Sequence, residues 1–121
     1  MANPVGSFVA LDPEARTAST FSRDLKGQWS SGVVIINCSA KTGTPSVTFD
    51  VEGKDPASGD YYPILTSVAI TGTGMTVLRI HPAMVAATNV IAAEVLPHTF
   101  RVRATHADGD SITYSVGVMV A

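Results

Sequence analysis

The last quarter of the chain, residues 98–121, most strongly limits what this sequence can fold into. It contains two runs in which apolar and polar side chains alternate, residues 99–105 and 111–120. An alternation with a period of two is typical of a β-strand that buries one face. Between the runs, Asp108-Gly109-Asp110 has the composition of a turn, because glycine accepts positive φ at little cost. The pattern predicts a β-hairpin at the centre of a sheet.

Short strand patterns recur through the rest of the chain at intervals of about ten residues. Val47 to Val51 alternate with polar residues, and Glu52 falls on the polar side, which predicts a strand with one wet face. Residues 29–39 are apolar on both faces, as expected of a strand buried on both sides or lying at a subunit contact. Residues 81–97 are compatible with a short helix, and equally with a helical turn followed by a loop.

These patterns predict one all-β domain, since 121 residues is the size of a single domain. The strand spacing favours a β-sandwich with an immunoglobulin-like Greek key, and a jelly roll is the alternative. Residues 1–17 contain Pro4, Gly6 and Pro13, which interrupt regular structure, so we expect an extended N-terminal arm. Such an arm either crosses its own domain or lies on a neighbouring subunit. The predicted organisation is an arm, 1–17, followed by a sandwich, 18–121.

Charged residues are few and scattered, which excludes some classes of function. They make up 15% of the chain, against 45% hydrophobic residues, and the net charge is −2. A nucleic-acid surface would show a basic stripe, and a disordered chain would be less apolar. The first residues lack the features of a secretory signal, and no run approaches the roughly 18 apolar residues that span a membrane. We expect neither nucleic acid nor a membrane as a partner, and synthesis in the cytoplasm.

Catalytic and metal-binding patterns are missing from the sequence. His81, His98 and His106 each lie in or beside a predicted strand, without a second ligand at metal-binding spacing. Cys38 is the only cysteine; it excludes an intramolecular disulfide and, in an apolar run, is expected to behave as a small buried hydrophobe. There is no nucleophile elbow and no glycine-rich phosphate loop. We therefore expect a protein that is not an enzyme and that has no cofactor.

Several residues are candidates for contacts with a partner. Arg101 and Arg103 form a row on the outer face of their predicted strand, where they are either solvated or available to an acidic partner surface. Trp29 lies next to the most apolar run and is expected in the core or at a subunit contact. Together with Tyr61 and Tyr62, it could instead form an aromatic platform for sugars.

Three segments resemble small virion proteins of tailed phages that infect actinobacteria. The first is residues 47–62, Val-Thr-Phe-Asp-Val-Glu-Gly-Lys-Asp-Pro-Ala-Ser-Gly-Asp-Tyr-Tyr. The others are residues 76–82, Thr-Val-Leu-Arg-Ile-His-Pro, and residues 95–102, Val-Leu-Pro-His-Thr-Phe-Arg-Val. The resemblance spans about residues 30–120 and rests on strand and turn signatures, not on catalytic motifs. It does not include the arm.

This resemblance implies a structural component of a phage particle, assembled in the host cytoplasm and located in the virion. We expect a capsid decoration protein that binds the outer surface of the major capsid protein, as a trimer with an obligate contact of roughly 2,000 Å² or more. The expected partner contacts are Phe8, Val9, Leu11, Trp29, Arg101 and Arg103. The alternatives are a subunit of the tail or baseplate and a module that binds host glycan.

Overall fold

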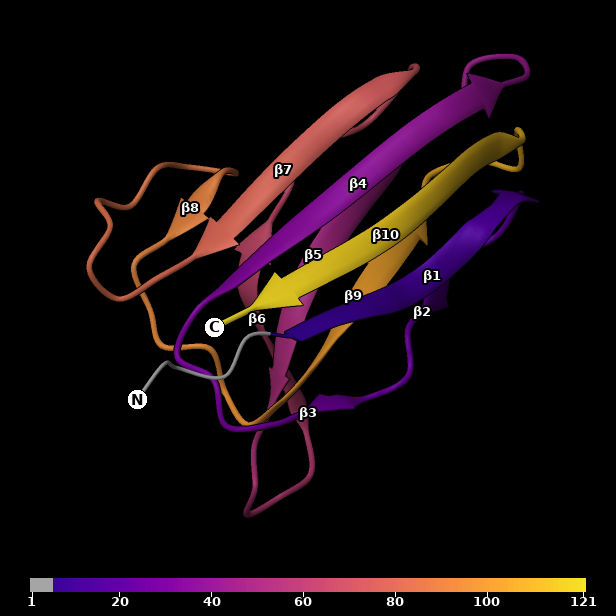
Figure 1. Cartoon of the computed structure of the whole chain (residues 1–121). Helices are drawn as coiled ribbons and strands as arrows, with labels where there is room; N and C mark the ends of the chain where they lie inside the picture. Colours follow the sequence, from indigo (N-terminus) through magenta and orange to yellow (C-terminus); the bar gives the residue numbers. More distant parts are fainter. Residues whose placement is uncertain (1–5) are drawn as a thin grey trace.

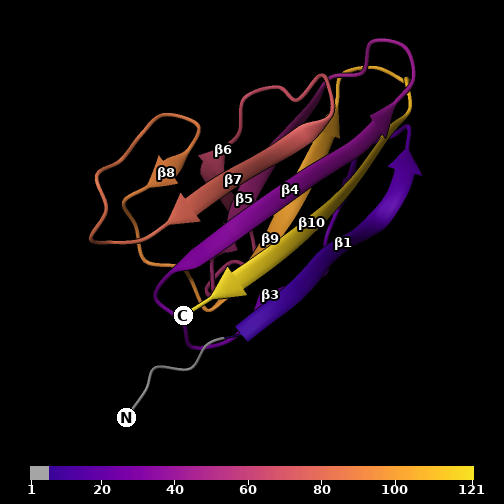
Figure 2. The same ribbon diagram turned by 45° about the horizontal axis from the view of Figure 1, so that its top comes forward.

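A computed structural model describes residues 6–121 and consists of two packed β-sheets (Figures 1 and 2). In sheet A the strands are, in spatial order, β1 (Gly6–Arg16), β10 (Ile112–Val120), β4 (Gly32–Lys41), β7 (Gly74–Ile80) and β8 (Ile91–Ala92). In sheet B they are β2 (Thr20–Phe21), β9 (Thr99–His106), β5 (Val47–Lys54) and β6 (Tyr61–Thr66), with β3 (Leu25–Lys26) also paired to β9. The predicted all-β sandwich is confirmed.

Neighbouring strands within each sheet are mostly distant in the sequence. The orders β1-β10-β4-β7 and β2-β9-β5-β6 pair the first strand with the last, as in a jelly roll, whereas an immunoglobulin-like sandwich has these two strands in different sheets. The connections therefore follow the jelly-roll alternative.

β10 lies between β1 and β4 and is antiparallel to both. β9 lies between β5 and the short strands β2 and β3. Only the pairing of β7 with β8 is parallel among the described strands. Over residues 6–121 the chain crosses between the sheets six times: after β1, β3, β4, β6, β8 and β9.

The hairpin predicted for the last quarter of the chain is wrong, although both of its strands exist. β9 belongs to sheet B and β10 to sheet A, so the turn around Gly109 carries the chain across the sandwich. Both strands bury their apolar side: Phe100 and Val102 on β9, and Ile112 and Val116 on β10, are fully buried. Alternation determines which face of a strand is buried, but it does not determine which strand is its hydrogen-bonded neighbour.

The core lies between the sheets and consists of the inward faces of their longer strands. Its largest buried side chains are Tyr114 and Phe49, whose rings meet edge to face with centroids 5.0 Å apart. Cys38 is buried in the core, as the sequence predicts, and burial raises the pKa of its thiol.

The first strand corrects the predicted boundary between arm and domain at residue 17. Residues 6–16 form β1, an edge strand of sheet A, and Leu11 lies in the core. Its pairing with β10 shifts register between Val9 and Leu11 and again between Leu11 and Glu14, where the strand accommodates Pro13. Pro13 therefore lies within an irregular edge strand and does not prevent the strand from forming. Residues 1–5 of the predicted arm lie outside the described residues.

The connection between β7 and β9 contains no helix. It consists of turns and the two-residue strand β8, so the turn-and-loop alternative holds. Asn89 has positive φ, 63°, a conformation that asparagine tolerates, and its side-chain amide donates to the carbonyl oxygen of Thr66 at 2.8 Å.

A buried ion pair covers the centre of the outer face of sheet B. Nε of Arg101 lies 2.9 Å from Oε1 of Glu52, and the two side chains are only 15% and 9% exposed. The guanidinium stacks between two rings, 3.5 Å from the centroid of Tyr61 and 4.5 Å from that of Phe21. The prediction that Glu52 lies on a wet face is therefore wrong, because the arginine and the rings shield its carboxylate from solvent.

We expect the substitution Glu52→Leu to lower the free energy of unfolding by about 3 kcal/mol, because it leaves a buried guanidinium without a counter-charge. Adding Arg101→Met should recover most of that loss, since methionine removes the charge and fills the space between the rings. Urea unfolding of the wild type, both single variants and the double variant measures the coupling. Additive losses would show that the two side chains do not stabilise each other.

His106 at the end of β9 is a half-buried polar group. Its Nε2 lies 2.9 Å from the hydroxyl oxygen of Tyr114, whereas its buried Nδ1 has no partner among the described residues. Burial lowers the pKa of His106; the carboxylate of Asp108 partly opposes this effect, and the guanidinium of Arg16 adds a smaller lowering. Burial also raises the pKa of Tyr114 to about 12. The folded protein therefore favours the neutral form of this histidine more than the unfolded chain does.

Because the folded state binds a proton at His106 less readily than the unfolded chain does, the free energy of unfolding should fall as the pH drops below about 6.5. Thermal unfolding between pH 5 and 8 measures this slope. His106→Gln removes the titrating group and should flatten the same part of the profile. An unchanged slope in this variant would contradict the assignment.

Candidate functional site

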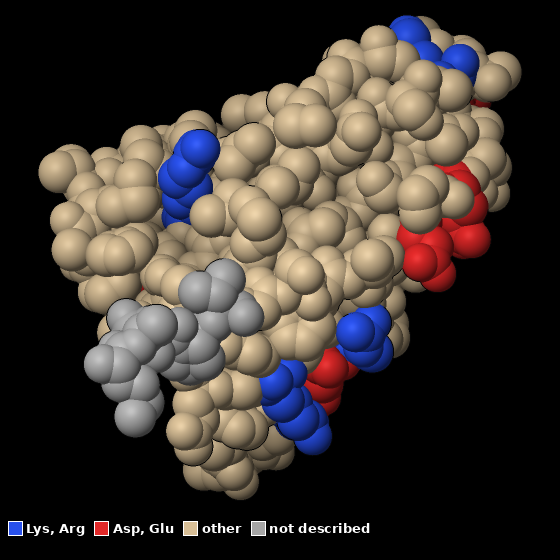
Figure 3. All heavy atoms as spheres, viewed as in Figure 1, with Lys and Arg blue, Asp and Glu red and all other residues tan. Residues whose placement is uncertain are grey.

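The outer face of sheet A is broad and almost free of charge. Figure 3 views it from outside, and Lys, Arg, Asp and Glu side chains lie mainly toward the margins of this view. Val34 and Ile36 of β4 point into the core, so the residues that alternate with them point outward. The residues paired with these outward positions on β10, β7 and β1 point outward as well. We call this surface the sheet A face and define it as Ser7, Val9, Val33, Ile35, Asn37, Met75, Val77, Arg79, Ser115, Gly117 and Met119.

An apolar row crosses the centre of the sheet A face. Val9, Gly117, Ile35 and Val77 are register partners on four adjacent strands. Side chains opposite each other on one face of paired strands lie about 4.5–5.5 Å apart, so Ile35 and Val77 are direct neighbours, whereas Gly117 separates Val9 from Ile35. Val9 is 55% exposed although it is apolar. Flanking positions add the exposed side chains of Met75 and Met119.

Gly117 leaves a notch in the middle of this row. A Cβ atom added there would have no heavy atom within 4 Å, and the backbone is not in the positive-φ region that would favour glycine. The fold therefore does not require glycine at this position. A glycine inside a strand often marks a place where another molecule approaches closely. The notch leaves room for a side chain of a partner.

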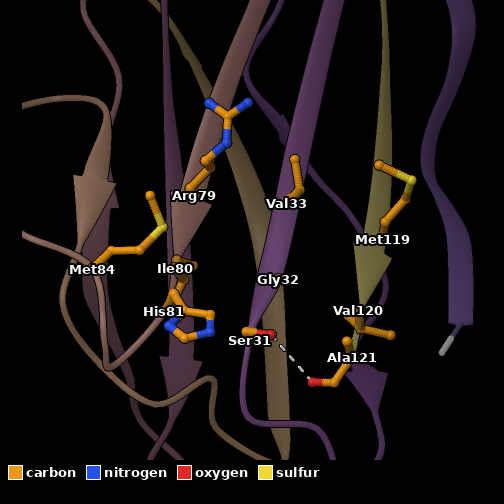
Figure 4. Close-up of a pocket in the computed structure, with 10 residues that line it drawn as sticks. All are labelled: Ser31, Gly32, Val33, Arg79, Ile80, His81, Met84, Met119, Val120 and Ala121. Carbon is orange, nitrogen blue, oxygen red and sulfur yellow. Dashed lines mark hydrogen bonds between the residues drawn. The ribbon is translucent and has the colours of Figure 1, made fainter. Parts of the chain in front are cut away.

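The sheet A face continues into an open apolar pocket of about 190 Å³ near the end of β10 (Figure 4). Val33, Met119, Arg79 and Met84 contribute side chains to its lining, together with residues 120–121. Its composition suits an apolar side chain of a partner better than a small polar substrate.

Two of the six predicted contact residues are largely covered by other residues of the chain. Leu11 is 8% exposed and packs in the core, because β1 is part of sheet A. Arg101 is held by Glu52 between the rings of Tyr61 and Phe21. Both placements result from contacts with neighbouring strands, which alternation alone does not reveal.

Phe8 and Trp29 form a contact with each other. Their rings meet edge to face with centroids 5.2 Å apart, and both pack against the core. The indole also lies across Gly27, where an added Cβ would be only 2.1 Å from it. Trp29 and Tyr61 therefore do not form a free aromatic platform, since Tyr61 is covered by Arg101. Of the three rings of the predicted platform, Tyr62 is the one that stays exposed, at 44%.

Val9 and Arg103 are the predicted contact residues that stay well exposed. Val9 belongs to the sheet A face, at 55% exposure. Arg103 lies on the outer face of sheet B, with its side chain 49% exposed and 4.0 Å from the Glu52 carboxylate. The structure thus places them on opposite sides of the sandwich.

Most of the sheet A face was missed from the sequence. The signal for Val33 and Ile35 was present, because residues 29–39 are apolar on both faces. Gly117 and Met119 lay on the side of their run that also carries serine and threonine, so nothing separated them from solvated residues. Their place beside β4 became evident only from the strand order.

Within residues 6–121 no group of three or more His, Cys, Asp or Glu side chains is placed to hold a metal ion. The same part of the chain contains no helix that is long and apolar enough to cross a membrane. Comparison with known proteins finds no matching family model and no matching curated protein.

We expect Gly117→Val to raise the free energy of unfolding by up to about 1 kcal/mol, because valine favours a strand and the notch has room for it. Gly27→Ala is the contrasting change, since its Cβ would collide with Trp29; it should cost about 1–3 kcal/mol. Chemical denaturation of both variants measures the difference. A clear loss of stability in Gly117→Val would show that the chain itself needs the notch empty.

Proposed function

We propose that this protein is a non-enzymatic capsid decoration protein of a phage, which docks on the major capsid protein through the sheet A face. The observation that carries the proposal is an apolar, nearly uncharged surface across four strands of a small domain. The largest apolar patch on a typical soluble monomer covers about 300–600 Å², and such a patch is often functional. The resemblance of residues 47–62 to phage virion proteins supports the choice of partner.

The size of the sheet A face suggests how such docking becomes stable. Four strands about 4.8 Å apart and five residues at about 3.4 Å each cover a flat area on the order of 300 Å². A standard interface buries about 800 Å² on each partner, so one face alone binds weakly. Copies linked to one another bind through several faces at once, which raises the apparent affinity without new contacts. The trimer expected from the resemblance is one way of linking them.

A subunit of the tail or baseplate would use the same face on a different partner, and this alternative stays open. The glycan-binding alternative has less support, because Trp29 and Tyr61 are covered by Phe8, Gly27 and Arg101. We therefore propose a protein partner, and not a glycan, for this surface.

Ile35→Lys and Gly117→Lys should each weaken capsid binding by about a hundredfold or more, since either lysine would bury an unpaired charge in the contact. Co-sedimentation with particles that lack the protein measures binding, with isolated tails as a second target. Near-UV circular dichroism checks that the variants fold.

The matched control is Arg103→Glu, which reverses a charge on the outer face of sheet B. It should bind capsids as the wild type does. Normal binding of Ile35→Lys and Gly117→Lys together with loss of binding in Arg103→Glu would move the contact to sheet B. Selective binding to tails would favour the tail subunit.

A further inference from the structure

β7 is an open edge of sheet A along most of its length. β4 pairs with it on one side from Gly74 to Ile80. On the other side, β8 pairs with it only at Arg79 and Ile80, and the rest of this edge is seen at the margin of the sheet in Figures 1 and 2. Within residues 6–121, the segment 74–78 therefore has no strand partner on its outer side.

The backbone of this segment presents hydrogen-bonding groups to that open side. The N–H of Arg79 points outward, because it donates to the carbonyl oxygen of Val90 at 2.9 Å. Backbone groups of successive residues in a strand point to opposite sides, so the N–H and C=O groups of Val77 and Met75 point outward as well. The outward N–H and C=O groups of Met75 and Val77 thus lie in line with the N–H of Arg79, which is already hydrogen-bonded to Val90.

The long edge of sheet A opposite β7 is protected against strand pairing. β1 contains Pro13 and two shifts of register. Three of its carbonyl oxygens already accept hydrogen bonds from side chains: that of Val9 from Arg23 at 3.0 Å, and those of Asp12 and Glu14 from Arg16 at 2.7 and 3.3 Å. The segment has none of these features.

The outer edges of sheet B are protected too. β6 carries Pro63, which cannot donate a ladder hydrogen bond, and β2 is only two residues long. The segment 74–78, Gly-Met-Thr-Val-Leu, has no proline, no charge and no shift of register against β4. Natural proteins block open edges, so an unblocked one is suited to accept a strand.

We propose that this edge pairs with the same edge of a second copy, antiparallel about a two-fold axis at Thr76. Met75 of one copy then lies opposite Val77 of the other, and each such pair exchanges both backbone hydrogen bonds. Gly74 lies opposite Leu78, so the overlap ends where β8 begins to cover the strand. A two-fold contact requires a self-complementary segment, and this uncharged one places no like charges opposite each other.

The geometry of this pairing favours a second copy over an unrelated strand. The two-fold axis of an antiparallel pair is perpendicular to the sheet, so rotation about it leaves both sheet A faces on the same side. Two faces side by side present an apolar area on the order of 600 Å² to one partner surface. This consequence rests on the proposed function, whereas the pairing itself does not.

Sedimentation of the full-length protein over a range of concentrations tests the proposal. The apparent mass should rise from that of one copy to that of two. In the same series, hydrogen exchange at the amides of Met75 and Val77 should slow as the dimer forms and return to the rate of open amides on dilution. Single copies at every concentration, a trimer, or a dimer in which these amides exchange freely would overturn it.

Val77→Pro removes an outward N–H without removing a hydrogen bond to β4, and should weaken the dimer at least about tenfold. The control is Met119→Lys, two strands away on β10, which should dimerise normally. If Val77→Pro does not fold, amide exchange at Met75 and Val77 of the wild type still tests whether this edge forms the dimer contact. Ile35→Lys separates the two proposals, because it should dimerise and yet fail to bind capsids.

Discussion

The burial of one alternating face of each sheet against the other is the constraint on which this structure depends. β9 and β10 carry fully buried side chains on opposite walls of the core, and Tyr114 and Phe49 fill the space between them. This contact uses only half of each strand's side chains. The outer faces are consequently free to differ, and they differ in a way that bears on function.

On the outer face of sheet B, charged side chains are paired with partners from the same chain, whereas the outer face of sheet A leaves apolar side chains exposed. On sheet B, Arg101 and Glu52 neutralise each other between aromatic rings, and Asp24 accepts a hydrogen bond from Tyr61 at 2.6 Å that lowers the pKa of its carboxyl. On sheet A, apolar side chains such as Val9 and Met75 stay in contact with water. A sandwich built in this way has a preferred side for contact with another protein.

The fold class could be predicted from the sequence, because period two is a local property that each strand carries by itself. The strand at residues 47–54 shows this clearly. Strand pairing could not be predicted, because it depends on which strands meet across the sandwich; the false hairpin and the misplaced arm both have this cause. The candidate site depends on pairing as well, since Val9, Gly117, Ile35 and Val77 form a row only when the strand order is known.

The position of β10 also has a consequence for how the chain reaches this structure. β10 is the last strand of the sequence, yet it lies between β1 and β4, and its pairing with β1 joins Gly6 to Val120. Such a contact closes a loop of almost the whole chain, and folds dominated by distant pairings form slowly, in milliseconds to seconds. Until β10 arrives, β4 lacks one neighbour and β1 has none in its sheet. Assembly of sheet A is therefore a late and cooperative step.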